Sequence, residues 1–235
     1  MFKAVLFDLD GTLLNIDMNF FLQKYFSRMQ KMALEAGYND SKGLVEQVFK
    51  STGVMISDRN PEHSNEEIFM RDFFSNGRYP EKDFREFFER FYEREFPLLE
   101  PYCKPFAGVP EMMEKLFDQD LKVVVATNAV FPLTALQQRL NWAGVGHFDY
   151  DLITSYEIMH FCKPHKEYYQ EVAEVIGVKP EECLMIGNDV GEDLPAGKIG
   201  MKTFLVEDML IDQGVGLSPD WRGKLNDLFS FMEKI

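Results

Sequence analysis

Two carboxylates follow a short apolar run near the start of the chain. Residues 4–7 read Ala-Val-Leu-Phe, and Asp8 and Asp10 come directly after them in the stretch KAVLFDLDGTLLN. A carboxylate such as Asp8 can attack phosphorus and form an aspartyl-phosphate. Asp10 can give a proton to the leaving-group oxygen and then take one from the attacking water. Gly11 allows the chain to turn sharply after the two acids.

This chemistry calls for a cation, because a carboxylate and a phosphate dianion repel each other. Mg²⁺ removes that repulsion, and proteins hold it with oxygen ligands, usually one or two carboxylates with water. Asn188 and Asp189, in the stretch GNDVGED, offer further oxygen ligands at the end of another apolar run. These residue types predict a Mg²⁺ site.

Two more stretches offer groups that suit a phosphoryl oxygen. The run ATN ends an apolar segment with the hydroxyl of Thr127 and, beyond it, the backbone N–H of Asn128. Lys163 stands before Pro164, just ahead of a helical pattern. A fixed ammonium group there can bind phosphate and offset the nearby acids.

The elements that must position these residues alternate between strands and helices. Short apolar runs predict strands at 121–128, 183–189 and 202–206, with a weaker candidate at 150–154. Helical patterns lie between them, at 109–119, 132–143, 165–177 and roughly 193–199. Residues 1–16 supply another buried strand. This alternation predicts an α/β fold, with a parallel sheet covered by helices on both faces.

The predicted sheet explains how distant residues come together. In an open α/β sheet, ligands bind beyond the carboxyl ends of the strands. Asp8, Thr127 and the pair Asn188–Asp189 each follow directly after an apolar run. We therefore expect all of them to project from one edge of the sheet.

A helical segment interrupts the sheet domain. Residues 17 to about 100 hold most of the phenylalanines and have apolar residues at helical spacing. Ser64 and Glu67 have the spacing of a capping box, which marks a helix start. We expect a core of residues 1–16 and 101–235, with residues 17–100 inserted as a separate helical domain. Aromatic residues at this spacing mostly form a core, and those near Phe20 to Tyr25 are candidates for lining a substrate entrance.

Charge and composition exclude some partners. The formal net charge of −14 argues against nucleic acid or an anionic membrane surface as a main partner. No apolar run has the length of a membrane span, and no signal-peptide pattern occurs. Three cysteines without a CxxC motif fit a reducing cytoplasm better than a disulfide framework.

Four motifs in order give the chain a family resemblance. The segments DLDGT, TN, KP and GND with the following ED resemble the motifs of the haloacid dehalogenase-like (HAD) hydrolase superfamily. The resemblance covers about two-thirds of the chain and implies a Rossmann-like core, Mg²⁺ dependence and usually phosphatase activity on a small phosphorylated metabolite. The helical segment lies where that family carries a helical cap of the C1 type.

The resemblance also implies roles for individual residues. Asp8 would be the nucleophile and Asp10 the acid and base, with the Asp10 backbone carbonyl on the metal. Thr127, with Asn128, and Lys163 would bind the phosphoryl group. Gly11, Thr12 and Asp193 would support the site.

The fourth motif departs from the family pattern, which usually reads Gly-Asp with a second acid four or five residues later. Counting from Gly187 puts Asn188 in the metal-ligand place. Counting back from Asp193 puts Asp189 there instead. Because Mg²⁺ prefers an anionic oxygen, we favour Asp189, with Asn188 as a neutral ligand or a neighbouring donor.

Other functions use the same motifs. A phosphomutase would share the aspartyl-phosphate step and differ only in its products. A dehalogenase would need neither Mg²⁺ nor an acid at Asp10, so the presence of Asp10 counts against it. A binding module without activity would have no use for the nucleophile and the metal acids, although a fold alone never proves a function. The leading hypothesis is a Mg²⁺-dependent phosphomonoester hydrolase.

Overall fold

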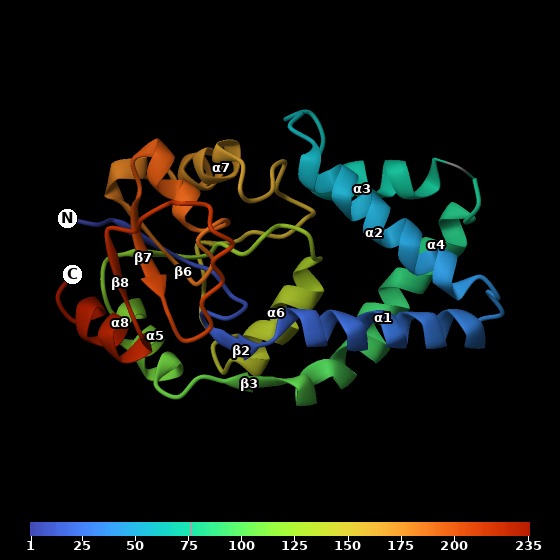
Figure 1. Ribbon diagram of the computed structural model, residues 1–235, viewed down its shortest axis with the longest axis horizontal. Helices are drawn as coiled ribbons and strands as arrows, with labels where there is room; N and C mark the ends of the chain where they lie inside the picture. The colour runs from blue at the N-terminus through green and yellow to red at the C-terminus, as the bar shows by residue number, and fades with distance from the viewer. Residues whose placement is uncertain (76) are drawn as a thin grey trace.

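The computed structural model describes residues 1–75 and 77–235 (Figure 1). Its centre is a six-stranded parallel sheet in the order β5-β4-β1-β6-β7-β8. The strands are β1 (Ala4–Phe7), β4 (Lys122–Val125), β5 (Leu152–Ile153), β6 (Cys183–Gly187), β7 (Lys202–Val206) and β8 (Trp221–Gly223). The predicted α/β fold with a parallel sheet is confirmed.

The first strand is central because all of its residues are apolar and buried. β1 pairs with β4 on one side and β6 on the other, so that Phe7 lies beside Val125 and Ile186. The three strands therefore end level with one another. The residues that follow them, Asp8 among them, meet at one edge of the sheet.

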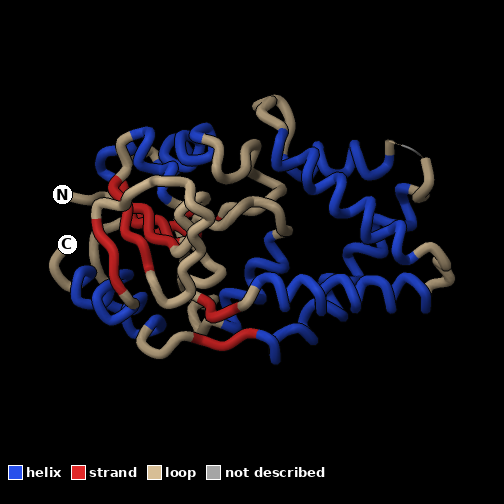
Figure 2. The backbone as a smooth tube through the Cα atoms, in the orientation of Figure 1, coloured by secondary structure: helices blue, strands red, loops and turns tan. Residues whose placement is uncertain are grey.

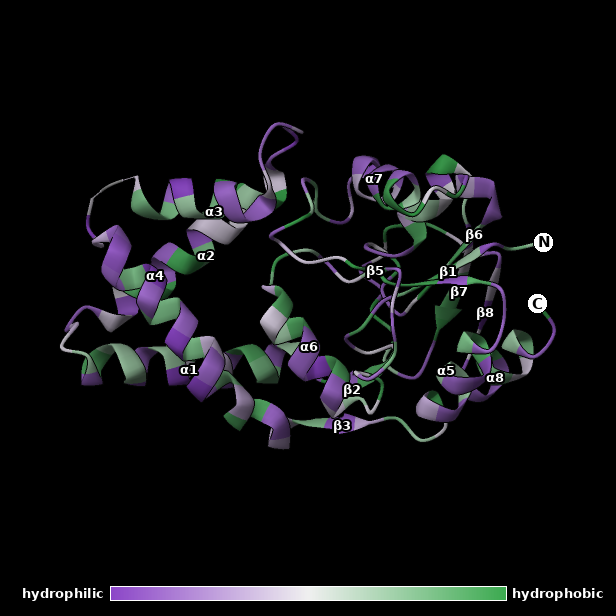
Figure 3. Ribbon diagram, turned by 180° about the vertical axis from the view of Figure 1, so that it is seen from behind, coloured by the Kyte–Doolittle hydropathy of each residue, from purple (hydrophilic) through white to green (hydrophobic). Residues whose placement is uncertain are grey.

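Both faces of the sheet are covered, and alternate residues of β1 serve opposite faces. Val5 and Phe7 pack in an apolar core with α5 (Val109–Phe117), α6 (Leu133–Trp142) and α8 (Leu225–Met232). Leu6 packs in a second core with α7 (Lys166–Ile176) and the 3-10 helix Leu194–Ile199. Figure 3 shows the strands as hydrophobic and the helices as mixed, which is the pattern of helices with one buried side.

Between β2 (Leu14–Ile16) and β3 (Cys103–Pro105) the chain forms helices, which we call the helical insertion, residues 18–102 (Figure 2). Its α-helices are α1 (Met18–Glu35), α2 (Ser41–Ser57), α3 (Asn65–Phe74) and α4 (Glu81–Arg90). A π-helical turn, Phe91–Glu95, and a 3-10 helix, Phe96–Tyr102, follow α4. Among the described residues, no helix is long and apolar enough to cross a membrane.

Aromatic packing holds the insertion together. The ring of Phe73 on α3 lies 5.1 Å from that of Tyr79 and 5.2 Å from that of Phe88 on α4. Phe84 and Phe87 are fully buried beside them. At the start of α3, Ser64 and Glu67 form the predicted capping box.

The insertion meets the sheet domain at several places, among them the following two. β2 and β3 pair as an antiparallel ribbon that carries the chain in and out, with Ile16 opposite Cys103. On the other side, the fully buried Asn65 at the start of α3 donates from its amide to the carbonyls of Ala129 (3.1 Å) and Phe161 (3.2 Å). Those two residues belong to the loops that carry Asn128 and Lys163.

Some predicted elements differ from the structure. Residues 1–16 do not form one strand, because Gly11, at φ +87°, turns the chain and places β2 in a separate two-stranded sheet with β3. The segment near 193–199 is a 3-10 helix rather than an α-helix; it contains Pro195 and ends at Gly200, at φ +98°. Strand β8 and helix α8 were not predicted from the sequence, whereas α2 lies within the segment that was predicted to be helical.

Candidate active site

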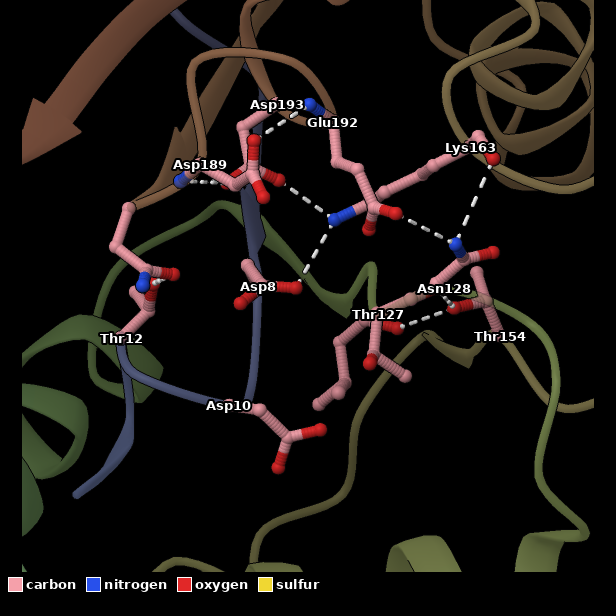
Figure 4. Close-up of polar contacts among 12 residues, drawn as sticks. Asp8, Asp10, Thr12, Thr127, Asn128, Thr154, Lys163, Asp189, Glu192 and Asp193 are labelled. Carbon is pink, nitrogen blue, oxygen red and sulfur yellow. Dashed lines mark hydrogen bonds and ion pairs between the residues drawn. The ribbon is translucent and has the colours of Figure 1, made fainter. Parts of the chain in front are cut away.

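A cavity of about 240 Å³ lies at the carboxyl edge of the sheet. The predicted residues that line it are Asp8, Asp10, Thr127, Asn128, Asn188, Asp189 and Asp193. They come from the loops after β1, β4 and β6, and Figure 4 shows the ammonium group of Lys163 between Asp8 and Asp193. The structure thus brings together side chains that are up to 185 residues apart, since Asp8 and Asp193 share this cavity.

Lys163 is fully buried and bridges two carboxylates. Its Nζ lies 3.0 Å from Oδ1 of Asp8 and 2.6 Å from Oδ1 of Asp193. Burial alone would lower the pKa of Lys163, but the carboxylates of Asp193 and Asp8 raise it well above its usual range. The side chain therefore stays charged, and it is fixed beside Asp8.

Asp8 sits in an environment that resists negative charge. Burial raises its pKa to about 8, with Asp193 and Asp10 adding repulsion and Lys163 opposing it. Burial also raises the pKa of Asp189, and it raises that of Glu192 to about 7. The edge of the sheet therefore gathers more carboxyl groups than the single ammonium of Lys163 can balance.

Asp10 is held by a residue that the motifs did not reveal. Its Oδ2 accepts a hydrogen bond from the guanidinium of Arg139, which is fully buried on α6. The guanidinium also lies over the ring of Phe131, 4.4 Å from its centroid. Oδ1 of Asp10 is buried and has no hydrogen-bond partner among the described residues. One signal was present in the sequence, since Arg139 falls on the apolar face of its helix beside Leu136 and Leu140.

The two glycines of the motifs permit close approaches. A Cβ at Gly11 would lie 2.3 Å from Nδ2 of Asn188, and one at Gly187 would lie 2.0 Å from Oδ2 of Asp193. Gly187 thus lets the Asp193 carboxylate reach the backbone N–H of Asp189, which donates to it over 2.8 Å. These contacts fix the loop after β6 against the loop after β1.

Asn188 and Asp189 differ in how their side chains are bound. The Asn188 amide is used at both ends: Oδ1 accepts from the Thr12 hydroxyl (3.1 Å) and Nδ2 donates to the Met209 carbonyl (2.6 Å). Oδ1 of Asp189 accepts from the backbone N–H groups of Gly191 (2.7 Å) and Glu192 (3.1 Å). Within the described residues, Oδ2 of Asp189 has no hydrogen bond.

The loop after β4 is fixed from behind. The Thr127 carbonyl accepts hydrogen bonds from the hydroxyls of Tyr168 (2.7 Å) and Thr154 (2.8 Å), neither of which the motifs singled out. The Asn128 amide donates to Glu192 over 3.1 Å. The hydroxyl of Thr127 takes part in none of these bonds, so it is available to a ligand in the cavity.

The carboxylates do not form a preformed metal cluster. Among the described residues, no group of three or more His, Cys, Asp or Glu side chains is arranged to hold an ion. Asp10 accounts for part of this, because its carboxylate points away from Lys163 toward Arg139 (Figure 4). Mg²⁺ sites commonly use only one or two carboxylates, with water and substrate phosphate completing the shell.

The fold and the site define a hydrolase with a Rossmann-like sheet and an aspartate at its carboxyl edge. Residues 2–199 match the family model described as haloacid dehalogenase-like hydrolase. The match covers most of the chain, so the chain belongs to this family.

Named relatives support this assignment. The chain is 32% identical to "Putative pyrophosphatase PpaX" of Clostridium perfringens, over 86% of this chain and 83% of that protein. It is 28% identical to the phosphoglycolate phosphatase of Aquifex aeolicus, over 86% and 84%. The L-2-haloacid dehalogenase of Xanthobacter autotrophicus has the same fold, with a TM-score of 0.60, 18% identity and complete coverage of both chains. Fold alone therefore does not choose between phosphate and halide chemistry.

Proposed function

We propose that this protein is a Mg²⁺-dependent phosphatase that hydrolyses a small phosphorylated metabolite through an aspartyl-phosphate on Asp8. The observation that carries the proposal is the buried Lys163 held 3.0 Å from Asp8 at the carboxyl edge of the sheet. A fixed cation beside a nucleophilic carboxylate suits a substrate with several anionic oxygens. The names of the two relatives, a putative pyrophosphatase and a phosphoglycolate phosphatase, favour phosphoryl transfer over dehalogenation.

In the first step an Asp8 oxygen attacks phosphorus, and the bond between phosphorus and the leaving-group oxygen breaks. Lys163 and the Thr127 hydroxyl bind phosphoryl oxygens. Thr127 lines the cavity, and the ammonium of Lys163 lies beside the nucleophile Asp8. Asp10 passes a proton to the departing oxygen through Oδ1, the oxygen that Arg139 leaves free.

In the second step water attacks the aspartyl-phosphate and restores Asp8. Asp10 now takes a proton from that water, which returns it to its starting state. Arg139 holds the Asp10 carboxyl in place through both steps by its bond to Oδ2. The same carboxyl therefore acts first as an acid and then as a base.

The residues at the sheet edge fit a divalent cation. Asp8 and Asp189 would each offer a carboxylate oxygen and Asp10 its backbone carbonyl, and Lys163 alone does not balance the carboxyl groups there. A bound Mg²⁺ would shield the negative charge of the phosphate from Asp8. Asp189 is the favoured ligand over Asn188, because its Oδ2 is free whereas both ends of the Asn188 amide are bonded.

We also propose that the helical insertion acts as a cap. Met18 of α1 borders the cavity that contains Asp8, and Asn65 ties α3 to the loops around Asn128 and Lys163. A cap in this place would exclude water during the first step and admit it for the second.

The three buried, unpaired cysteines support a reducing cytoplasm as the location of the protein. The net charge argues against nucleic acid and anionic membranes as partners.

The test is phosphate release from a panel of phosphorylated metabolites, with and without Mg²⁺. We expect release with at least one ester, dependence on Mg²⁺ and no release by Asp8→Asn. Analysis of the products distinguishes a hydrolase from a phosphomutase. A hydrolase frees inorganic phosphate, whereas a phosphomutase moves the phosphoryl group to another hydroxyl of the substrate. Metal-independent release, or release by Asp8→Asn, would contradict the proposal.

A further inference from the structure

A second cavity, also about 240 Å³, lies between the helical insertion and two loops of the sheet domain. Its walls come from α1, α2, α3 and α4, the turn after α4 and two loops of the sheet domain. Met18, Val130 and Phe131 line both this cavity and the one that contains Asp8. The two spaces are therefore adjacent and share part of their lining.

The walls of the second cavity carry no charge. Of its 15 lining residues, eight are aromatic, and none is Asp, Glu, Lys, Arg or His. Its most buried polar groups are the hydroxyls of Tyr25 and Tyr92, which bond to each other over 2.9 Å. Burial raises the pKa of both hydroxyls, so both remain neutral. An anionic group placed there would lose its water without gaining a charged partner.

We propose that this cavity binds the leaving group of the substrate, and that the leaving group is an uncharged apolar alcohol, alkyl or aryl. The inference rests on the proposed phosphatase function. The Asp8 oxygen forms its bond to phosphorus, the ester P–O bond breaks, and the alcohol oxygen leaves with the proton from Asp10. The alcohol is then the product that the cavity holds.

The size of the cavity agrees with this occupant. An apolar cavity of about 150 Å³ is enough to bind benzene. A space of about 240 Å³ therefore admits a leaving group larger than one aromatic ring. The phosphate end would remain at the sheet edge, where Lys163 and Asp8 lie, so that one molecule spans a charged site and an apolar one.

This substrate class differs from those named for the two relatives. Pyrophosphate and phosphoglycolate each carry a second anionic group beyond the reacting phosphate. Among the described residues that line the cavity none is a cation, and the guanidinium of Arg139, which lies over the ring of Phe131, is already paired with Asp10. We therefore expect this chain to select against such substrates. In their complexes the second anionic group would be buried without a charged partner, which weakens binding.

The experiment measures kcat/KM for n-alkyl phosphates from ethyl to hexyl, for phosphoglycolate and pyrophosphate, and for acetyl phosphate. The alkyl esters differ little in leaving-group basicity, so chain length reports burial. We expect kcat/KM to rise about fourfold for each added methylene until the cavity is full. Phosphoglycolate and pyrophosphate should be at least about tenfold poorer than butyl phosphate.

Variants of Thr52, a half-buried wall residue on α2, test where the selectivity lies. Thr52→Trp should fill the space and lower kcat/KM for hexyl phosphate at least about tenfold, with acetyl phosphate unchanged. Thr52→Arg should lower kcat/KM for hexyl phosphate similarly and raise kcat/KM for phosphoglycolate and pyrophosphate. Val54→Arg is the matched control, because Val54 lies on the same helix, is 39% exposed and does not line the cavity.

The outcomes separate this inference from the proposed function. If neither acetyl phosphate nor any ester releases phosphate, the phosphatase proposal itself fails. If acetyl phosphate is hydrolysed but kcat/KM is flat along the alkyl series, the apolar-leaving-group proposal is overturned. A Thr52→Trp variant that is more stable and selects substrates as the native chain does would identify the space as a packing void. If the Thr52 variants do not fold, the alkyl series on the native chain still decides.

Discussion

The edge of the sheet and the interior of the helical insertion differ in the kind of side chain that they bury. At the sheet edge, Lys163 joins Asp8 and Asp193, and charged groups are buried at the cost of their hydration. In the insertion, rings such as Phe73 and Phe88 pack without charge. The first region is specified by chemistry, so few residue types are acceptable there. The second is specified by volume and hydrophobicity, so many sequences would serve.

Asp8→Asn should have the largest effect, because it removes the nucleophile of the first step. We expect phosphate release to fall by at least about 10⁴-fold for every substrate, with the fold retained. The measurement is initial-rate phosphate release, with thermal unfolding as the control for folding. Turnover close to that of the native chain would rule out a covalent intermediate on Asp8.

Asp10→Asn should have the next largest effect, and it should depend on the leaving group. Loss of the proton donor should slow alkyl phosphates by about 10²- to 10⁴-fold. Aryl phosphates with weakly basic leaving groups need little protonation, so they should still form the phosphoenzyme. Equal losses in the rate of phosphoenzyme formation for alkyl and aryl esters would contradict the acid role of Asp10.

Arg139→Met tests whether the buried guanidinium positions Asp10. We expect alkyl phosphate turnover to fall about 10²-fold. The loss should be smaller for weakly basic leaving groups, because these leave without being protonated and so depend less on the position of the acid. Breaking the buried pair should also destabilise the fold by about 3–5 kcal/mol in urea unfolding. Adding Asp10→Asn should recover part of that stability, since it removes the unpaired carboxylate. A uniform activity loss across leaving groups would indicate a structural role alone.

Asp189→Asn should change the metal requirement more than the chemistry. We expect the Mg²⁺ concentration for half-maximal activity to rise about 10- to 100-fold, because an amide oxygen binds the ion less strongly than a carboxylate. Asn188→Ala is the matched variant, and it should raise the requirement only slightly. The reverse order would show that Asn188 holds the ion.

Phe84→Ala should have the smallest effect on chemistry and a large one on stability. Phe84 is fully buried in the insertion, so we expect a loss of about 3–5 kcal/mol in urea unfolding. Acetyl phosphate turnover, measured below the unfolding transition, should stay within about twofold. Phe20→Ala is the control, because Phe20 is 44% exposed and should cost little. A loss of acetyl phosphate turnover in folded Phe84→Ala would show that the two regions are not independent.

The same contrast explains what the sequence could predict. Asp8, Thr127 and Asn188 were placed at one edge because each ends an apolar run, and parallel strands with such runs share a direction. Arg139 was missed because its partner Asp10 lies 129 residues away, and only the fold brings them together. The cavity walls around Thr52 were beyond prediction for a similar reason: apolar residues at helical spacing show which side is buried and not where packing leaves a space.

The β2–β3 ribbon has a consequence for how such a chain can be altered. Because Ile16 lies opposite Cys103, the helical insertion leaves and re-enters the core at neighbouring points. Closing a loop there costs little more for a long segment than for a short one, about 0.6 kcal/mol for each doubling of length. We therefore expect the ribbon to accept a different helical segment between β2 and β3. Another helical segment joined at the same ribbon would bring a different pocket and leave the alignment of β1, β4 and β6 untouched.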